Sequence, residues 1–216
     1  MIIAIDGPVA GGKSTAARNL AKDLGFEHLD TGALYRMVTL LARRSNTDPA
    51  DREAVKSLLR SANVRLSGDR AFLNGEDVSD AIRLPEISSS VKPFAENQDV
   101  RDFVNAYARR FASSRNIVVE GRDMGTVVFP DAGLKIFLTA SVEERAKRRW
   151  EELTTRGTPQ PYDKVLADLQ KRDREDTHRP IAPLLQAPDA VVIDSSGWTP
   201  TQTRSKLLAL AKEHVK

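Results

Sequence analysis

Gly7-Pro8-Val9-Ala10-Gly11-Gly12-Lys13-Ser14 stands between the apolar run Ile2 to Ile5 and an amphipathic stretch. It matches the pattern G-x-x-x-x-G-K-[ST]. In that pattern the glycines let backbone N–H groups turn toward a phosphate, and the following helix adds the positive end of its dipole. We expect Lys13 to reach the β- and γ-phosphates of a bound nucleotide and Ser14 to bind Mg²⁺. A chance glycine-rich turn is the alternative, but a position between a strand and a helix favours the phosphate loop.

The predicted ATP site includes the loop and the residue after it. Its members are Gly7, Pro8, Val9, Ala10, Gly11, Gly12, Lys13, Ser14 and Thr15.

Nearly continuous apolar runs predict the strands. Four are clear and a fifth is weaker: residues 2–5, 117–119, 134–138 and 190–193, and then residues 26–29. Runs without alternation are typical of parallel strands that are buried on both faces. The helical stripes between them predict a P-loop α/β fold, in which a doubly wound five-stranded parallel sheet is flanked by helices.

The helical stripes recur at intervals of three and four residues. The first follows the loop and is closed by Gly25, which is a typical residue just beyond a helix end. The stripes are Ala17, Leu20, Ala21 and Leu24; Leu34, Val38 and Leu41; Val100, Phe103, Val104, Tyr107 and Phe111; and Leu207, Leu208 and Ala211.

Residues 63–79 break this rhythm. Short strand-like pieces are separated by the turn signals Gly68-Asp69 and Asn74-Gly75, which predict a small antiparallel insertion. A second irregular stretch, Thr154 to Pro161, lies between two predicted helices.

Composition limits the class of protein. The chain has 216 residues, of which 40% are hydrophobic, and its net charge is only +3 because 30 acidic residues offset 33 basic ones. This balance gives no general case for nucleic-acid binding. The absence of cysteine excludes disulfides, thiolate metal sites and a cysteine nucleophile. No apolar run approaches the roughly 20 residues that span a bilayer. We therefore expect a cytoplasmic protein with no membrane or nucleic-acid partner. No exposed apolar seam is evident in the sequence, so we also expect a monomer.

Other P-loop proteins remain as alternatives. A GTPase would need a guanine-reading N-K-x-D segment, and the sequence contains none. Residues 117–120 could be interpreted as the apolar run and acidic residue of an ATPase motor. The segment Gly121-Arg122-Asp123 that follows points instead to a second substrate, because the carboxyl ends of parallel strands are where doubly wound sheets bind ligands.

Candidate acceptor residues appear in three further places. In the segment from Leu29 to Arg36, Thr31 could cap a helix beginning at Gly32 or Ala33, and Tyr35 and Arg36 fall off that helix's apolar stripe, where a solvated face is the alternative. The other two places are rich in arginine. One contains Arg145, Arg148 and Arg149, and the other contains Arg172, Asp176 and Arg179. Phosphoryl transfer needs fixed positive charge around both phosphate chains, and arginine forks suit this role.

Taken together, these motifs resemble bacterial cytidylate kinases, of the nucleoside monophosphate kinase group, along essentially the whole chain. The resemblance rests on the opening Ile-Asp-Gly-Pro and the loop, on residues 29–36, 74–79, 82–83 and 100–101, on residues 121–132 above all, and on residues 172–184. The phosphate loop alone would not choose among kinases.

The resemblance implies transfer of the γ-phosphate of ATP to CMP or dCMP, with Mg²⁺, in a single P-loop domain over residues 1–216. It also implies a monophosphate-binding insertion over residues 62–93 and a lid over residues 149–162, with Arg145 and Arg148 at the lid's root. Residues expected to act on the phosphates are Lys13, Arg122, Arg179, Arg145 and Arg148.

The resemblance also implies the acceptor contacts. Thr31, Tyr35 and Arg36 would hold the nucleotide, and Arg101 and Asp123 would read the cytosine edge. Arg36, Arg122 and Arg179 would grip its phosphate, while Arg172 and Asp176 would contact the sugar.

One position departs from the family. Lys92 stands where cytidylate kinases commonly have a base-reading serine, after Ser88-Ser89-Ser90-Val91. Either a neighbouring serine takes this role or the base pocket is altered. Two further functions therefore stay open: a P-loop kinase with another acceptor, such as UMP or a small metabolite, and a nucleotide-dependent switch or nucleic-acid-stimulated ATPase.

Overall fold

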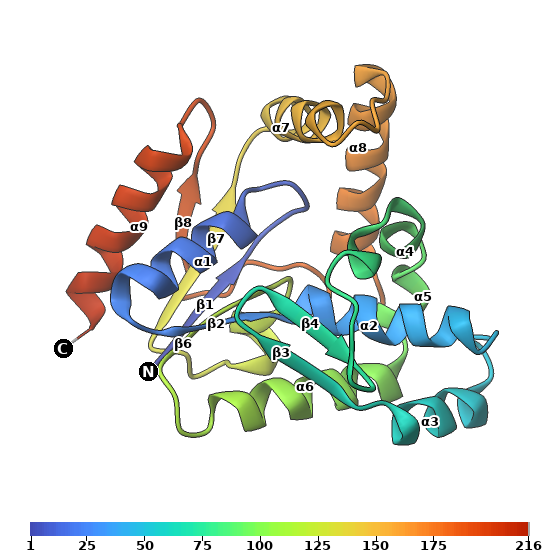
Figure 1. Ribbon diagram of the computed structural model, residues 1–216. Helices are drawn as coiled ribbons and strands as arrows, with labels where there is room; N and C mark the ends of the chain where they lie inside the picture. The colour runs from blue at the N-terminus through green and yellow to red at the C-terminus, as the bar shows by residue number, and fades with distance from the viewer. Residues whose placement is uncertain (216) are drawn as a thin grey trace. The chain divides into compact units, whose positions relative to one another are not determined.

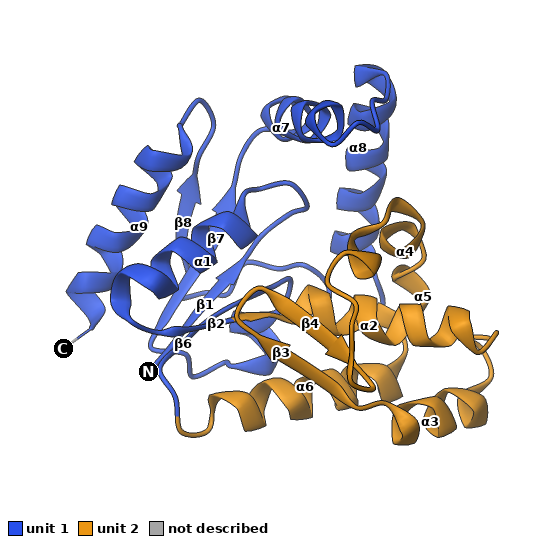
Figure 2. Cartoon of the chain, viewed as in Figure 1, with its two compact units in different colours: residues 1–28, 115–216 blue, residues 29–114 orange. Residues whose placement is uncertain are grey.

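The computed structural model describes residues 1–215, which fall into two compact units (Figures 1 and 2). Unit 1 comprises residues 1–28 and the chain from residue 115 onward, and unit 2 comprises residues 29–114.

Unit 1 is built on a five-stranded parallel sheet in the order β2-β6-β1-β7-β8. Ile3 of β1 lies opposite Val118 of β6 and Leu134 of β7, so β1 is central. The sheet confirms all five predicted strands, including the weak one. Their bounds are β1 Ile2–Asp6, β2 Glu27–Asp30, β6 Ile117–Gly121, β7 Leu134–Thr139 and β8 Val191–Asp194.

Two helices of unit 1, α1 and α9, pack together in one hydrophobic core with the strands. Leu20 of α1 and Leu207 of α9 join Ile3, Ile5 and Ile136 in this core. Gly25 ends α1 in the left-handed conformation with φ of 68°, as its sequence position predicts. The helices of unit 1 are α1 Lys13–Leu24, the π-helix η2 Met124–Val128, α7 Val142–Thr155, α8 Tyr162–His178 and α9 Pro200–His214.

The α7–α8 hairpin has a small core of its own. Ala146, Leu153, Val165 and Leu169 form it, and partly buried side chains that include Val9 and Ala10 of the phosphate loop pack against it. The hairpin therefore shares apolar packing with the loop that precedes α1.

Unit 2 packs around α2. That helix meets α3, α4, α5, α6 and β4, and its buried side chains form the centre of the unit's core. The predicted turns at Gly68-Asp69 and Asn74-Gly75 join three antiparallel strands. The elements are α2 Thr31–Arg44, α3 Arg52–Ser61, β3 Val64–Ser67, β4 Arg70–Leu73, β5 Glu76–Asp77, η1 Ala81–Arg83, α4 Pro85–Ser89, α5 Lys92–Ala95 and α6 Gln98–Ala112.

Within residues 1–215, no helix combines the length and the apolar character that crossing a membrane would need.

Candidate functional site

The phosphate loop connects the central strand β1 to α1, as its sequence pattern predicts. Gly7 has φ of 150°, and a Cβ atom there would lie 2.0 Å from the carbonyl oxygen of Leu138, so only glycine fits. Gly12 (φ 84°) and Ala10 (φ 57°) also have positive φ. Ala10 is unusual, because the left-handed region costs a residue with a Cβ atom about 1–2 kcal/mol. The loop is therefore a defined and partly strained backbone shape.

Lys13 lies almost fully buried at the start of α1. Its exposed fraction is 5%, and its Nζ donates a hydrogen bond of 2.6 Å to the carbonyl oxygen of Pro8. Burial, together with the nearby positive charge of Arg122, lowers the pKa of Lys13 to about 7. An ammonium group in this position would gain strongly from an anionic partner such as a phosphate.

Ser14 is tied to the end of strand β6. Its Oγ donates to Oε2 of Glu120 at 2.7 Å, and Oε1 of Glu120 lies 3.0 Å from Nε2 of His28. The hydroxyl hydrogen of Ser14 is thus used in the bond to Glu120. Ser14 is exposed, so its oxygen can still act as a ligand. This arrangement fits a hard cation such as Mg²⁺.

Among the residues described, no cluster of three or more histidine, cysteine, aspartate or glutamate side chains could hold a metal.

The segment after β6 is fixed to the strand that precedes the loop. Asp6 accepts hydrogen bonds from the backbone N–H groups of Met124 (2.9 Å) and Gly125 (2.7 Å). Burial raises the pKa of Asp6, although these two hydrogen bonds oppose the rise. A Cβ atom at Gly125 would lie 3.2 Å from the side chain of Lys135, so this backbone passes close to its neighbours. Arg122 and Asp123 are therefore presented from an anchored backbone.

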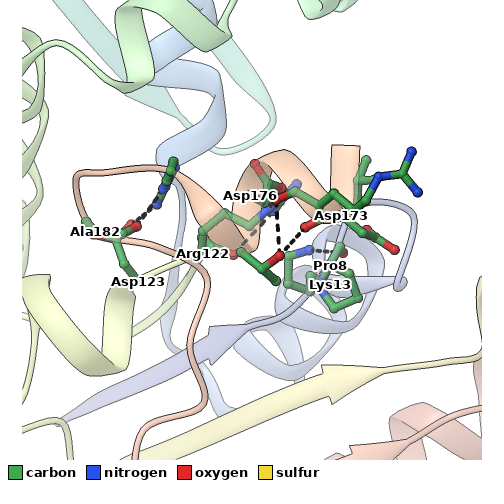
Figure 3. Close-up of polar contacts among 12 residues, drawn as sticks. Pro8, Lys13, Arg122, Asp123, Asp173, Asp176 and Ala182 are labelled. Atoms are coloured by element: carbon green, nitrogen blue, oxygen red, sulfur yellow. Dashed lines mark hydrogen bonds and ion pairs between the residues drawn. The ribbon is translucent and has the colours of Figure 1, made fainter. Parts of the chain in front are cut away.

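A network of arginines and carboxylates lies beside Lys13 (Figure 3). Nε of Arg122 donates to Oδ2 of Asp176 at 2.8 Å, and Nη2 of Arg179 donates to Oδ1 of Asp123 at 3.2 Å. Burial would raise the pKa of Asp176, but its ion pair with Arg122 outweighs this, and the pKa is lowered. The carboxylates keep these guanidinium groups in place.

Arg145 and Arg148 project from α7 and contact protein atoms. Arg148 donates to the Oγ (3.2 Å) and the carbonyl oxygen (2.7 Å) of Ser195, just after β8. Arg145 is 5% exposed and contacts Ala140, Val9 and Asp173. Arg172 lies half-buried on α8.

Unit 2 contains the remaining predicted residues. Nη2 of Arg36 donates to Oδ2 of Asp30 at 2.9 Å, and the buried Nε atom of Arg36 has no hydrogen-bond partner among the residues that the structure describes. Arg101 is 1% exposed and donates to the carbonyl oxygen of Ala95 at 3.3 Å. A buried guanidinium that is held by a hydrogen bond to a backbone carbonyl oxygen is well suited to orient a planar ligand.

Two local expectations for α2 are wrong. The helix begins at Thr31, and Asp30 is its cap, since Oδ1 of Asp30 accepts from the N–H of Ala33 at 3.0 Å. The solvated-face alternative fails for Tyr35, which is 8% exposed, because α2 is surrounded by other elements of unit 2 rather than lying on its surface. Thr31 is likewise buried, at 2% exposure.

The serines before Lys92 differ in their bonding. The hydroxyls of Ser89 and Ser90 donate to the carbonyl oxygen of Glu86 at 3.1 and 2.7 Å. The hydroxyl of Ser88 has no hydrogen-bonding partner among residues 1–215. Lys92 begins α5 and is exposed.

Unit 1 thus brings together the loop, Arg122, Asp123, Arg145, Asp176 and Arg179, whereas Thr31, Tyr35, Arg36 and Arg101 belong to unit 2. The sequence reasoning gave no role to Asp6, His28 or Asp173, and set Glu120 aside as a motor-like residue. Glu120 and Asp6 both end buried strands beside the loop, a position that could have identified them.

Comparison with known proteins adds a family. The sequence model described as "Cytidylate kinase" matches residues 3–213. A cytidylate kinase of Caldanaerobacter subterraneus subsp. tengcongensis is 44% identical over 214 residues, covering 99% of this chain and 96% of that protein. One from Mycolicibacterium paratuberculosis is 45% identical over 218 residues, with coverage of 99% and 96%.

Solved structures show a likeness of fold alone. An uncharacterised protein from Eubacterium ventriosum has a TM-score of 0.55 at 13% identity, with 98% of each chain covered. A putative kinase from Chloroflexus aurantiacus has a TM-score of 0.50 at 14% identity, covering 100% of this chain and 98% of that one.

Proposed function

The chain belongs to the cytidylate kinase family, and from that premise we propose how its residues carry out the family's reaction. The protein is a kinase that transfers the γ-phosphate of ATP to CMP or dCMP, giving ADP and CDP or dCDP. The observation that carries the assignment of roles is the position of Arg122 beside Lys13, which places an arginine network next to the phosphate loop.

The donor side is the phosphate loop. Backbone N–H groups from Gly7 to Thr15 surround the phosphates of ATP, and Lys13 leaves the carbonyl oxygen of Pro8 to bind the transferring phosphate. Ser14 would hold Mg²⁺ through its oxygen while Glu120 keeps its hydroxyl hydrogen. The ion would supply positive charge for the oxygens of the transferring phosphate.

The acceptor side uses arginines that are already ion-paired. Arg122, Arg179 and Arg36 bind the acceptor phosphate, and Arg172 and Asp176 contact the sugar. Because Asp176 and Asp123 hold their guanidinium partners before substrate arrives, little reorganisation is needed at transfer. No covalent nucleophile is required, since the acceptor phosphate is itself an anion.

Base recognition involves Arg101 and Asp123, while Thr31 and Tyr35 hold the nucleotide. The hydroxyl of Ser88, which has no hydrogen-bonding partner within the described residues, takes the role that Lys92 cannot perform as a cation on an exposed helix start. A hydroxyl both donates and accepts, so it can pair with the amino group or with the ring acceptors of cytosine.

Residues 149–162 act as a lid and residues 62–93 as the monophosphate-binding insertion of a single P-loop domain. Closure of the lid, with Arg148 at its root, keeps water from accepting the phosphate. The protein acts as a cytoplasmic monomer without nucleic-acid or membrane partners.

The test is a coupled assay of ADP release with CMP, dCMP, UMP, AMP and GMP offered separately. We expect the highest kcat/KM with CMP or dCMP. Equal efficiency across the five acceptors would exclude cytidylate specificity, and release without any acceptor would support the switch or ATPase alternative.

A further inference from the structure

Arg145 is a buried arginine whose bonding is almost complete within the protein. Its Nε donates to the carbonyl oxygen of Ala140 at 2.9 Å, and its Nη1 donates to that of Val9 at 3.2 Å. Nη1 and Nη2 also bind the two oxygens of Asp173, at 3.1 and 2.6 Å. These bonds use four of the five N–H donors of a guanidinium. Little of the group is left for a phosphate.

The carbonyl group that Arg145 binds lies at the strained point of the phosphate loop. Val9 directly precedes Ala10, whose φ of 57° is left-handed. For a residue with a Cβ atom this conformation disfavours the local backbone about 5- to 30-fold unless contacts hold it. Two contacts do so: the hydrogen bond from Arg145 and the packing of Val9 and Ala10 against the α7–α8 core.

The same side chain reaches the acceptor side through Asp173 on α8. Asp176, which binds Arg122, lies about one helical turn after Asp173 on α8, and Arg179 follows as the C-cap of that helix. Arg145 therefore connects the donor loop to the helix that positions the acceptor arginines.

We propose that Arg145 is a positioning residue that holds the left-handed Val9–Ala10 segment of the phosphate loop, rather than a group that touches phosphate. This proposal rests on the proposed function, since it concerns how the ATP site is shaped. It replaces the phosphate contact expected of Arg145 from its sequence position.

A mutant cycle tests it. R145Q removes the guanidinium group and its hydrogen bonds to Val9 and Asp173. A10G removes the backbone strain at residue 10, because glycine adopts positive φ without cost. We expect R145Q to weaken MgADP binding about tenfold, as titration calorimetry measures it, and to raise the KM for ATP similarly. The R145Q/A10G double variant should recover at least half of that loss on a logarithmic scale.

Matched variants separate this effect from general ones. Asn46 has φ of 52° in a turn after α2, so N46G relieves the same kind of strain elsewhere and should not rescue R145Q. R204Q removes an exposed arginine of α9 and should leave MgADP binding unchanged. R145K keeps the charge but not the fork, and should be as impaired as R145Q and equally rescued by A10G. If R145Q does not fold, as its melting temperature shows, the cycle is run with R145K.

Loss of MgADP affinity in R145Q or R145K that A10G leaves unchanged would overturn the proposal, as would near-normal binding in R145K. A failure of the proposed function would look different, because the unmodified protein would then bind MgADP without transferring phosphate to CMP.

Discussion

At the scale of single residues, Lys13 illustrates how the site is prepared for phosphate. Its amine is buried and lies near Arg122, and within residues 1–215 its hydrogen-bond acceptor is the carbonyl oxygen of Pro8 alone. A cation in these surroundings is costly until an anion arrives, so the interaction with a phosphate should be strong.

We expect Lys13→Ala to lower kcat about 100- to 1,000-fold, the usual range when one preorganised donor to a reacting group is lost. Steady-state kinetics with ATP and CMP give the measurement. Lys22→Ala, on the exposed face of the same helix, is the control and should retain activity. Near-normal turnover of Lys13→Ala would rule out its role at the transferring phosphate.

Ser88 tests how the departure at Lys92 is compensated. If its hydroxyl reads the base, Ser88→Ala should reduce the ratio of kcat/KM for CMP to that for UMP about tenfold, the effect of an unmet hydrogen bond of 1–2 kcal/mol. Ser89→Ala removes a hydroxyl that donates to Glu86 and should not change the ratio. An unchanged ratio in Ser88→Ala would contradict this role, since the base would then be recognised by other residues.

At the scale of elements, the strands were predictable and several helical details were not. Runs such as residues 117–119 are apolar throughout because both faces of the sheet are buried, and that signal is local. The sequence also carries a signal for α3, which lies outside the predicted helices. Val55, Leu58 and Leu59 share one face of this helix after its cap, Asp51. The π-helix η2 depends on Asp6, over 100 residues earlier in the chain, so no local pattern could reveal it.

The turn after α7 lies within the proposed lid, and its backbone conformation can be tested through stability. Gly157 has φ of 73°, and the N–H groups of Gly157 and Thr158 donate to the carbonyl oxygens of Thr154 and Leu153 in a Schellman arrangement. A Cβ atom at Gly157 would meet nothing within 4 Å, so only the backbone conformation opposes a larger residue.

Gly157→Ala should therefore reduce the free energy of unfolding by about 1–2 kcal/mol. Urea denaturation measures it. Gly133→Ala is the matched control, because Gly133 lacks positive φ and an added Cβ atom would make only ordinary contacts, at 3.5 Å or more. Equal stability of the two variants would contradict the conformation of this turn.

The β4–β5 hairpin of unit 2 predicts a pH dependence. The hydroxyl and the N–H group of Ser79, together with Arg70, lower the pKa of Asp77 to about 2 from an ordinary 3.8. The unfolded chain therefore binds more protons between these values, so the stabilisation is present above about pH 4 and is lost as the pH falls toward 2.

We expect Asp77→Asn to have a lower urea midpoint than the unmodified protein at pH 6, with the difference shrinking between pH 4 and pH 3. Circular dichroism follows the unfolding. A difference between the two proteins that is constant with pH would contradict the ionic role of Asp77.

At the scale of the whole molecule, the sequence predicted the class of site better than its surroundings. The phosphate loop and the residues around Arg122 were identified because the glycine required at position 7 and the apolar strand that ends before Arg122 appear directly in the sequence. The core of unit 2 joins the strands of residues 64–77 to α2 and α6, and such a long-range association has no local signature. The ion pairs from Asp123 to Arg179 and from Arg122 to Asp176 span more than 50 residues and also required the structure.

The central claim is that the arginine network beside the phosphate loop serves a cytidine monophosphate. The most direct test is a competition in one tube, with equal concentrations of CMP, dCMP, UMP, AMP and GMP and limiting ATP, followed by chromatographic separation of the diphosphates. Every transfer also forms one ADP from ATP, so only ADP in excess of the other diphosphates reports AMP as an acceptor. The account predicts that CDP and dCDP together exceed UDP, GDP and this excess ADP. A mixture in which UDP, GDP or the excess ADP matches them would contradict it.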